Sequence, residues 1–327
     1  MGHNQDFIEY LREGIAIYGT HFGSSRNNSL RLGIYDDTEL ALAKFIEAPG
    51  SLIVSSGMWA GQLVMKMIEV LVPESQTIKY HYAPRVHPAL WGNEFVQSKS
   101  DWKDWASGIV SSLDQSPSDW THIICSDAIG SPWAEEFDFS IFNDLPEKNN
   151  IWLILDDSHS LGVRDENGKG CYKSITENIP ANIIVVSSLN KALGIPAGVI
   201  FGKANILEVL RNSAWFAGAS PPSPAYIYAL HSLLKNNSFV KANTALKSNI
   251  VYLNEKITSK ETFHSVPNYP VLCSHDARLY EHLLINGIMA SCFSYPSPTD
   301  SPVSRLAISA LHQKKDLDHL AEVLVKF

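Results

Sequence analysis

Two continuous apolar runs, each followed at once by a polar cluster, constrain the fold of this chain more than any other feature. Residues 151–155 (IWLIL) lead directly to Asp156, and residues 183–186 (IIVV) lead to Ser188. Short apolar runs of this kind are typical of strands that are buried on both faces, as in a parallel sheet covered by helices. Because α/β sheets hold ligands at the carboxyl ends of their strands, we expect the two polar clusters to share one site.

The two clusters combine a carboxylate, an imidazole and an amine. The first cluster is DDSHSLG, from Asp156 to Gly162, and the second is SLNKALG, from Ser188 to Gly194. A lysine that can form a Schiff base and a carboxylate that can keep a pyridine nitrogen protonated are what pyridoxal 5′-phosphate (PLP) requires. The alternatives are a solvated lysine and an aspartate that caps a helix N-terminus. The pattern favours a PLP enzyme in which Lys191 carries the cofactor and moves protons at the substrate Cα.

These clusters resemble the motifs of the α-oxoamine synthases, a family of fold-type I PLP enzymes. That family carries Asp-Glu-Ala-His-Ser-x-Gly at the first cluster and Thr-x-Ser/Gly-Lys-Ala-x-Gly at the second. The matching residues are Asp156, His159, Ser160, Gly162, Lys191, Ala192 and Gly194. The resemblance implies an α/β fold, with a large domain built on a mainly parallel sheet flanked by helices and a small α+β C-terminal domain. It also implies that Asp156 pairs with the pyridine nitrogen and that His159 bonds the cofactor's phenolic oxygen.

A third segment resembles the phosphate site of the same family. Gly57, Met58 and Trp59 open an apolar helical stretch directly after a strand-like run, so free backbone N–H groups at the helix start can hold a phosphate. The family has Ser-Gly-x-x-Ala-Asn here, and Gly61 departs from its asparagine. We expect the Ser188 hydroxyl to replace the family threonine as a further phosphate ligand.

Two more residues match the family by their surroundings. His87, in VHPALWG, resembles the histidine that stacks on the cofactor ring and steers the substrate carboxylate. Arg305, in SRLAISALH, resembles the arginine whose planar fork grips the α-carboxylate of an amino acid. His81 lies six positions before His87, but two histidines with no further ligand pattern predict no metal site.

Composition excludes several other classes of protein. The 327 residues are 45% hydrophobic and 18% charged, as expected for a globular chain with a large core. The net charge of -8 is spread out and no Lys/Arg block is present, so we expect no nucleic-acid partner. No apolar run approaches the roughly 18 residues of a membrane span. The four cysteines show no Cys-x-x-Cys spacing, which favours reduced thiols in a soluble, cytoplasmic protein.

Alternating patterns predict the order of the elements. Helices are expected at 6–17, 37–47, 204–211 and 315–325, with a long helical reach from Ala225 towards Thr258. Strands are expected at 51–55, 77–82, 93–97, 121–125, 151–156, 182–187, 198–201 and 304–309. The predicted domains are a PLP-binding domain at 36–211, preceded by the segment 1–35, and a C-terminal domain at 212–327.

The resemblance implies a homodimeric transferase that condenses an amino acid with an acyl thioester, carried by CoA or an acyl carrier protein, with loss of carbon dioxide. Family members usually carry several tens of further N-terminal residues that help form the thioester pocket, so an aminotransferase or an aldol-type lyase on the same scaffold is the alternative. A PLP-binding protein without turnover is a second. A hydrolase built from Ser160, His159 and Asp156 is disfavoured, because the chain has no Gly-x-Ser-x-Gly elbow.

Overall fold

The computed structural model describes residues 1–72, 77–92, 94–147, 150–257, 263–295 and 297–327. The chain divides into two compact units. Unit 1 comprises Met1–Ala128 and Phe137–Phe239, and unit 2 comprises Ile129–Glu136 and Val240–Phe327. The predicted domain limits, 36–211 and 212–327, differ from this division.

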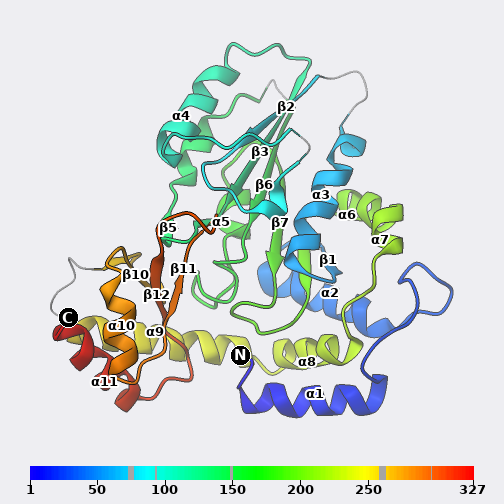
Figure 1. The fold of residues 1–327 in the computed structure, drawn as a ribbon. Helices are drawn as coiled ribbons and strands as arrows, with labels where there is room; N and C mark the ends of the chain where they lie inside the picture. Colours follow the sequence, from blue (N-terminus) through cyan, green and yellow to red (C-terminus); the bar gives the residue numbers. More distant parts are fainter. Residues whose placement is uncertain (73–76, 93, 148–149, 258–262, 296) are drawn as a thin grey trace. The chain divides into compact units, whose positions relative to one another are not determined.

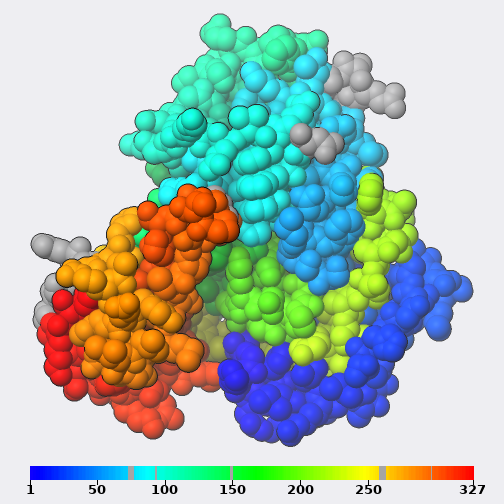
Figure 2. All heavy atoms as spheres, viewed as in Figure 1, coloured from blue at the N-terminus to red at the C-terminus, as the bar shows by residue number. Residues whose placement is uncertain are grey.

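The difference arises from the packing of the N-terminal helices. Helix α8 (Pro224–Lys235) packs along α1 (Gln5–Tyr18) and α2 (Gly33–Ile46), so residues 1–35 and 212–239 join the large unit. In α1 and α8, Phe7 and Tyr226 place their ring centroids 6.1 Å apart. Figure 2 shows α1, in dark blue, on the outside of unit 1 beside the yellow-green α8.

The described part of unit 1 is built on one six-stranded sheet (Figure 1). Its order is β1 (Ser51–Val54), β8 (Gly198–Phe201), β7 (Asn182–Ser188), β6 (Asn150–Asp156), β3 (Trp120–Asp127) and β2 (Thr77–Tyr82). The four strands from β7 to β2 run parallel, whereas β8 is antiparallel to both of its neighbours. This mainly parallel sheet confirms the predicted α/β fold class.

Helices and apolar side chains cover the sheet. Fully buried residues such as Leu52, Ile123, Ile154 and Ile184 come from the strands, and Leu63 comes from α3 (Gly57–Leu71). The other helical segments of the unit are η1 (Pro88–Leu90), α4 (Trp102–Leu113), η2 (Phe139–Asp144), α5 (Tyr172–Thr176), α6 (Ala204–Arg211) and α7 (Ala214–Gly218). Burial on both faces explains why the strands read as continuous apolar runs.

Three element predictions were wrong in detail. Residues 94–97 form no strand, and Asn93 lies outside the described residues. Helix α2 begins at Gly33 instead of residue 37, and Thr38 therefore lies inside it, where its hydroxyl donates to the Ile34 carbonyl (2.6 Å) rather than capping the helix. The long helical reach is broken into α8 and α9 (Ser238–Lys256), since Asn237 between them adopts a φ of +61°. Thr258 lies outside the described residues.

Unit 2 contains an antiparallel sheet and the last helices. Its sheet order is β11 (Ser291–Phe293), β12 (Val303–Ala307), β10 (Val271–Ser274) and β9 (His264–Ser265). It also holds α10 (Arg278–Ile285), α11 (Lys314–Val325) and the short pair β4 (Ile129–Gly130) and β5 (Glu135–Glu136). This composition matches the predicted small α+β domain. No helix in the described ranges has both the length and the apolar character that crossing a membrane requires.

Candidate active site at the carboxyl ends of the parallel strands

The predicted site residues of unit 1 gather where the parallel strands end. Asp127, Asp156 and Ser188 are the last residues of β3, β6 and β7, and His87 follows β2. Asp127 is the register partner of Asp156 on the neighbouring strand. Adjacent parallel strands therefore deliver these side chains to one edge of the sheet, as the sequence predicted.

Asp156 is fixed by its own turn and not by a helix. It is 6% exposed, and its Oδ1 atom accepts a hydrogen bond from the Ser158 N–H (2.9 Å). Its Oδ2 atom lies 3.7 Å from Nδ1 of His87. In the described chain the next helix after β6 begins only at Tyr172, so the alternative reading of Asp156 as a helix cap was wrong. One carboxylate oxygen is held in place while the other faces the histidine.

The neighbouring Asp157 connects the turn after β6 to the segment around Cys171. It is 1% exposed, and its Oδ2 atom accepts a hydrogen bond from the Cys171 N–H (3.3 Å). Burial raises the pKa of Asp157 to about 7. Asp156 and Asp157 are thus adjacent in the chain but contact different parts of it.

His87 presents a neutral ring. Its Nδ1 atom accepts a hydrogen bond from the Ala89 N–H (3.1 Å), which assigns the ring proton to Nε2. Burial lowers the pKa of His87, against the opposing effect of Asp156. The backbone N–H of His87 is shared between Oδ1 and Oδ2 of Asp127, each at 3.2 Å. A flat, neutral ring held by its backbone is suited to stacking on an aromatic cofactor.

Lys191 and His159 meet across two loops. The Lys191 Nζ atom lies 3.0 Å from Nε2 of His159. The lysine loop is closed by hydrogen bonds from Leu189 N–H to Ala197 O and from Ile195 N–H to Leu189 O, both 2.9 Å. The loop needs Gly194, whose φ is +73°. An amine and an imidazole are therefore held together beside the ends of β6 and β7.

Ser158 joins the two clusters that the sequence singled out. Its hydroxyl accepts a hydrogen bond from the Ser188 N–H (2.7 Å). The segment before Lys191 is therefore tied directly to the turn that follows Asp156. No local sequence pattern signals this contact, because it depends on the pairing of β6 with β7.

The start of α3 fits a phosphate group. The Ser56 hydroxyl caps this 15-residue helix by accepting from the Trp59 N–H (3.1 Å), and this cap does not use the N–H groups of Gly57 and Met58. A Cβ atom on Gly57 would lie 2.5 Å from Cβ of Ser188, so only glycine allows this approach. The helix dipole and free N–H groups favour an anion here. This donor set, with Asp156 and Lys191 at the same sheet edge, fits PLP.

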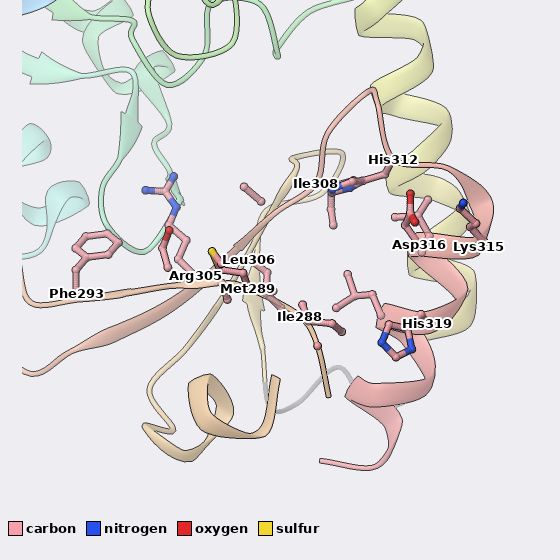
Figure 3. A pocket seen from close by; sticks show the side chains of 16 residues that line it. Ile288, Met289, Phe293, Arg305, Leu306, Ile308, His312, Lys315, Asp316 and His319 are labelled. Carbon is pink, nitrogen blue, oxygen red and sulfur yellow. The ribbon is translucent and has the colours of Figure 1, made fainter. Parts of the chain in front are cut away.

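Arg305 belongs to unit 2, where it lies on β12. It lines a cavity of about 930 Å³ together with residues of the β11 edge and of α11. In Figure 3 the guanidinium group of Arg305 lies at one end of this lining, and His312, Lys315, Asp316 and His319 lie at the other. The sequence analysis assigned Arg305 to the same site as the residues of unit 1. In the structure Arg305 belongs to unit 2.

One buried carboxylate was missed by the sequence analysis. Asp127 is 5% exposed and lies opposite Asp156. A signal for it existed, because it follows an apolar run just as Asp156 does, but the predicted strand stopped at Cys125. Among the described residues, no group of three or more His, Cys, Asp or Glu side chains could hold a metal ion.

Residues 5–324 match the family described as aminotransferase class I and II. The chain belongs to the class I and II aminotransferases. This membership, with a donor set that fits PLP, confirms the predicted fold class and cofactor.

Curated relatives indicate which enzymes within the class I and II aminotransferase family this chain is similar to. The chain is 24% identical to 8-amino-7-oxononanoate synthase of Nitrosomonas europaea, covering 97% of this chain and 84% of the relative. It is 27% identical to the enzyme of the same name from Petrotoga mobilis, over 97% and 83% of the two chains. The prediction of a PLP-dependent transferase resembling the α-oxoamine synthases is thereby confirmed.

Solved structures agree at the level of the fold. The serine palmitoyltransferase of Sphingomonas wittichii superposes with a TM-score of 0.82 at 15% identity, covering 99% of this chain and 84% of that one. The 8-amino-7-oxononanoate synthase of Francisella tularensis gives a TM-score of 0.74 at 22% identity, over 99% and 93% of the two chains.

Proposed function

We propose that this transferase condenses an amino acid with an acyl thioester, with loss of carbon dioxide, to give an aminoketone. The names of the curated relatives support this reaction class. The observation that carries the proposal is the contact of Lys191 with His159 (3.0 Å) at the sheet edge that also holds Asp156. When bound, PLP supplies an electron sink for the charge that develops at the substrate Cα.

Asp156, His87 and the start of α3 hold the cofactor in this proposal. The carboxylate of Asp156, fixed by the Ser158 N–H, keeps the pyridine nitrogen protonated. The neutral ring of His87 would stack on the pyridine ring. The N–H groups of Gly57, Met58 and Trp59 and the hydroxyl of Ser188 would bind the phosphate, and the Trp59 N–H would be shared with the Ser56 cap.

Lys191 and His159 handle protons beside the substrate. Lys191 would hold the cofactor, and with an amino acid bound its amine would remove and return the proton at the substrate Cα. His159, whose Nε2 atom lies within hydrogen-bond distance of that amine, would donate to the phenolic oxygen of the cofactor.

We assign the α-carboxylate of the amino acid to Arg305. Its guanidinium offers two parallel N–H donors, which match a carboxylate better than a lysine does. Support comes from the family resemblance around β12 and from the cavity that Arg305 lines.

We further propose a homodimer in the cytoplasm. The segment 217–220 resembles the one with which the family reaches the phosphate of the partner subunit, although Ser220 is its one hydroxyl. The four cysteines are free thiols, as expected in a reducing compartment. Sedimentation equilibrium at several concentrations tests the dimer, and a monomer at every concentration would contradict it.

Isotope exchange tests the reaction. The PLP-loaded protein is incubated with single amino acids in deuterium oxide, and loss of the Cα proton is followed by NMR. Acyl-CoA thioesters are then added, and free thiol and carbon dioxide are measured. We expect exchange with a small set of amino acids and thiol release only when both substrates are present. Keto-acid formation without thioester would replace the proposal with transamination, and exchange that survives in Lys191→Ala would remove the lysine from the chemistry.

A further inference from the structure

Two buried carboxyl groups lie side by side at the end of the sheet. Asp127 and Asp156 are 5% and 6% exposed and are register partners on the parallel strands β3 and β6. Side chains of register partners on adjacent strands point to the same face. Two ionised carboxylates in such a place repel each other with little solvent to screen them, so one of the pair retains a proton.

The contacts of the two residues decide which of them is the acid. Asp156 has one oxygen fixed by the Ser158 N–H and the other facing the His87 ring, so it is free to pair with a pyridine nitrogen. Asp127 instead directs both oxygens at the backbone N–H of His87. A single N–H shared at 3.2 Å from each oxygen is weak support for a full negative charge.

The titratable groups around Asp127 also favour a protonated Asp127. These are Asp156 from β6, Lys191 from the loop after β7, and His87 from the segment after β2. Burial, and then the Asp156 carboxylate, raise the pKa of Asp127 well above its usual range, and the His87 N–H and Lys191 oppose them. The His87 ring adds no positive charge at neutral pH, because burial lowers its pKa.

We propose that Asp127 holds a proton and acts as a positioning residue: as a neutral acid it leaves one negative charge, on Asp156, for the pyridine nitrogen, and it anchors the segment that carries the stacking His87. The consequence for the cofactor rests on the proposed function. The protonation of Asp127 is independent of the proposed function, since it follows from groups of the protein alone.

The protonation is tested on cofactor-free protein. Infrared spectra at neutral pH, with aspartate carboxyl groups labelled with carbon-13, should show the carbonyl band of a protonated acid that Asp127→Asn removes. Asp157→Asn is the matched control, because Asp157 is also buried with a raised pKa. A protonated-acid band that persists in Asp157→Asn supports the proposal even where Asp127→Asn does not fold. Its absence from Asp157→Asn would overturn the proposal.

The pH dependence of stability gives a second readout. The folded state keeps a proton on Asp127 that the unfolded state releases, so this residue makes the free energy of unfolding fall as pH rises above the ordinary aspartate range. Asp127→Asn cannot ionise and should be flatter in this range than the wild type. Equal slopes in the two proteins would contradict a protonated Asp127.

Cofactor affinity tests the positioning role. Asp127→Asn retains an uncharged acceptor for the His87 N–H, so its affinity for PLP, measured by absorbance titration, should stay within about threefold of the wild type. Asp127→Ala removes the acceptor of that part-buried N–H and should lower the affinity roughly tenfold or more. Equal affinity in Asp127→Ala and wild type would refute the positioning role. A wild type that binds no PLP would refute the proposed function, while the infrared result would still decide the state of Asp127.

Discussion

The Nζ atom of Lys191 lies 3.0 Å from the Nε2 atom of His159, although 32 residues separate them in the chain. The contact follows from the pairing of β6 with β7, in which Asp156 is opposite Val186. Each residue sits a few positions beyond its strand, so the parallel register brings the two loops together. The same register brings the loop that carries Lys191 and the carboxylate that would activate a pyridine ring to one edge of the sheet.

Borohydride treatment of the PLP-loaded protein should fix the cofactor to Lys191. The reason is that this amine is exposed at the sheet edge and beside His159. Peptide mass spectrometry locates the reduced adduct, and Lys203 serves as a control amine outside the site. An adduct on any other lysine would reassign the cofactor-binding residue.

Replacing Asp156 should impair chemistry far more than replacing Asp157. Asp156→Ala removes the charge that keeps the pyridine nitrogen protonated, so Cα proton exchange should slow by roughly a hundredfold or more. Asp157→Ala removes the acceptor of the Cys171 N–H and should lower the free energy of unfolding by about 1 to 3 kcal/mol. Exchange rates from NMR and urea unfolding separate the two effects. Similar exchange rates in both variants would return Asp156 to a structural role.

Arg305→Lys should weaken amino-acid binding while PLP stays bound. Lysine keeps the charge but loses the planar fork, and a charge-assisted hydrogen bond contributes roughly 1.5 to 3 kcal/mol, or about ten- to a hundredfold in affinity. Spectroscopic titration with the amino acid measures the change. Lys315→Ala, at the other end of the same cavity, is the control and should bind as the wild type does. An unaltered affinity in Arg305→Lys and Arg305→Ala would exclude Arg305 from the site.

Glu39→Ala should be strongly destabilising. Glu39 is 5% exposed and accepts from Arg26 (2.7 Å), Arg211 (2.5 Å) and the Ile53 N–H (2.7 Å). Its loss leaves the buried Arg26 without this partner, and breaking a buried ion pair costs about 3 to 5 kcal/mol. Urea unfolding measures the difference, with the exposed Glu9→Ala as a control. A change below about 1 kcal/mol would show that water or Asp36 replaces the interaction.

Acid should destabilise unit 1 through two histidines. His81 Nε2 and His122 Nδ1 lie 3.0 Å apart across β2 and β3, and His122 Nε2 lies 2.8 Å from the Ser116 hydroxyl. Burial lowers the pKa of His81 to about 4 and also lowers that of His122. Between about pH 4 and pH 6.5 the histidines are protonated in the unfolded state but not in the folded state. The contribution of the neutral histidine pair to stability is therefore present above about pH 6.5 and is lost as pH falls towards 4.

Urea unfolding of wild type and His81→Gln between neutral and acidic pH checks this expectation. The variant cannot take up a proton at position 81, so its stability should fall less on acidification. The comparison between the two proteins is needed because Asp127 and Asp157, with raised pKa values, contribute a slope of the opposite sign. Parallel curves would show that the histidine pair does not titrate on unfolding.

The sequence by itself determined the strands that end at the site and the residue types that they deliver. The apolar runs before Asp156 and Ser188 predicted buried strands, and the motifs around Asp156, His159 and Lys191 predicted the cofactor. Each run and each motif is a short segment of consecutive residues, so it can be read without the fold. Local sequence did not predict the helix break or the unit boundary that depend on tertiary packing. Asn237 breaks a helix that the pattern extended, and α1 and α2 draw α8 into the large unit.

Only the tertiary structure placed Asp127 opposite Asp156 and His81 against His122. These pairs join residues 29 and 41 positions apart through the register of neighbouring strands, which no local pattern encodes. The protonation of each group depends on how far its partner and the surrounding apolar atoms exclude water. Burial and distance across a sheet are properties of the folded chain, and for that reason the acid–base character of this site emerges only from the packed structure.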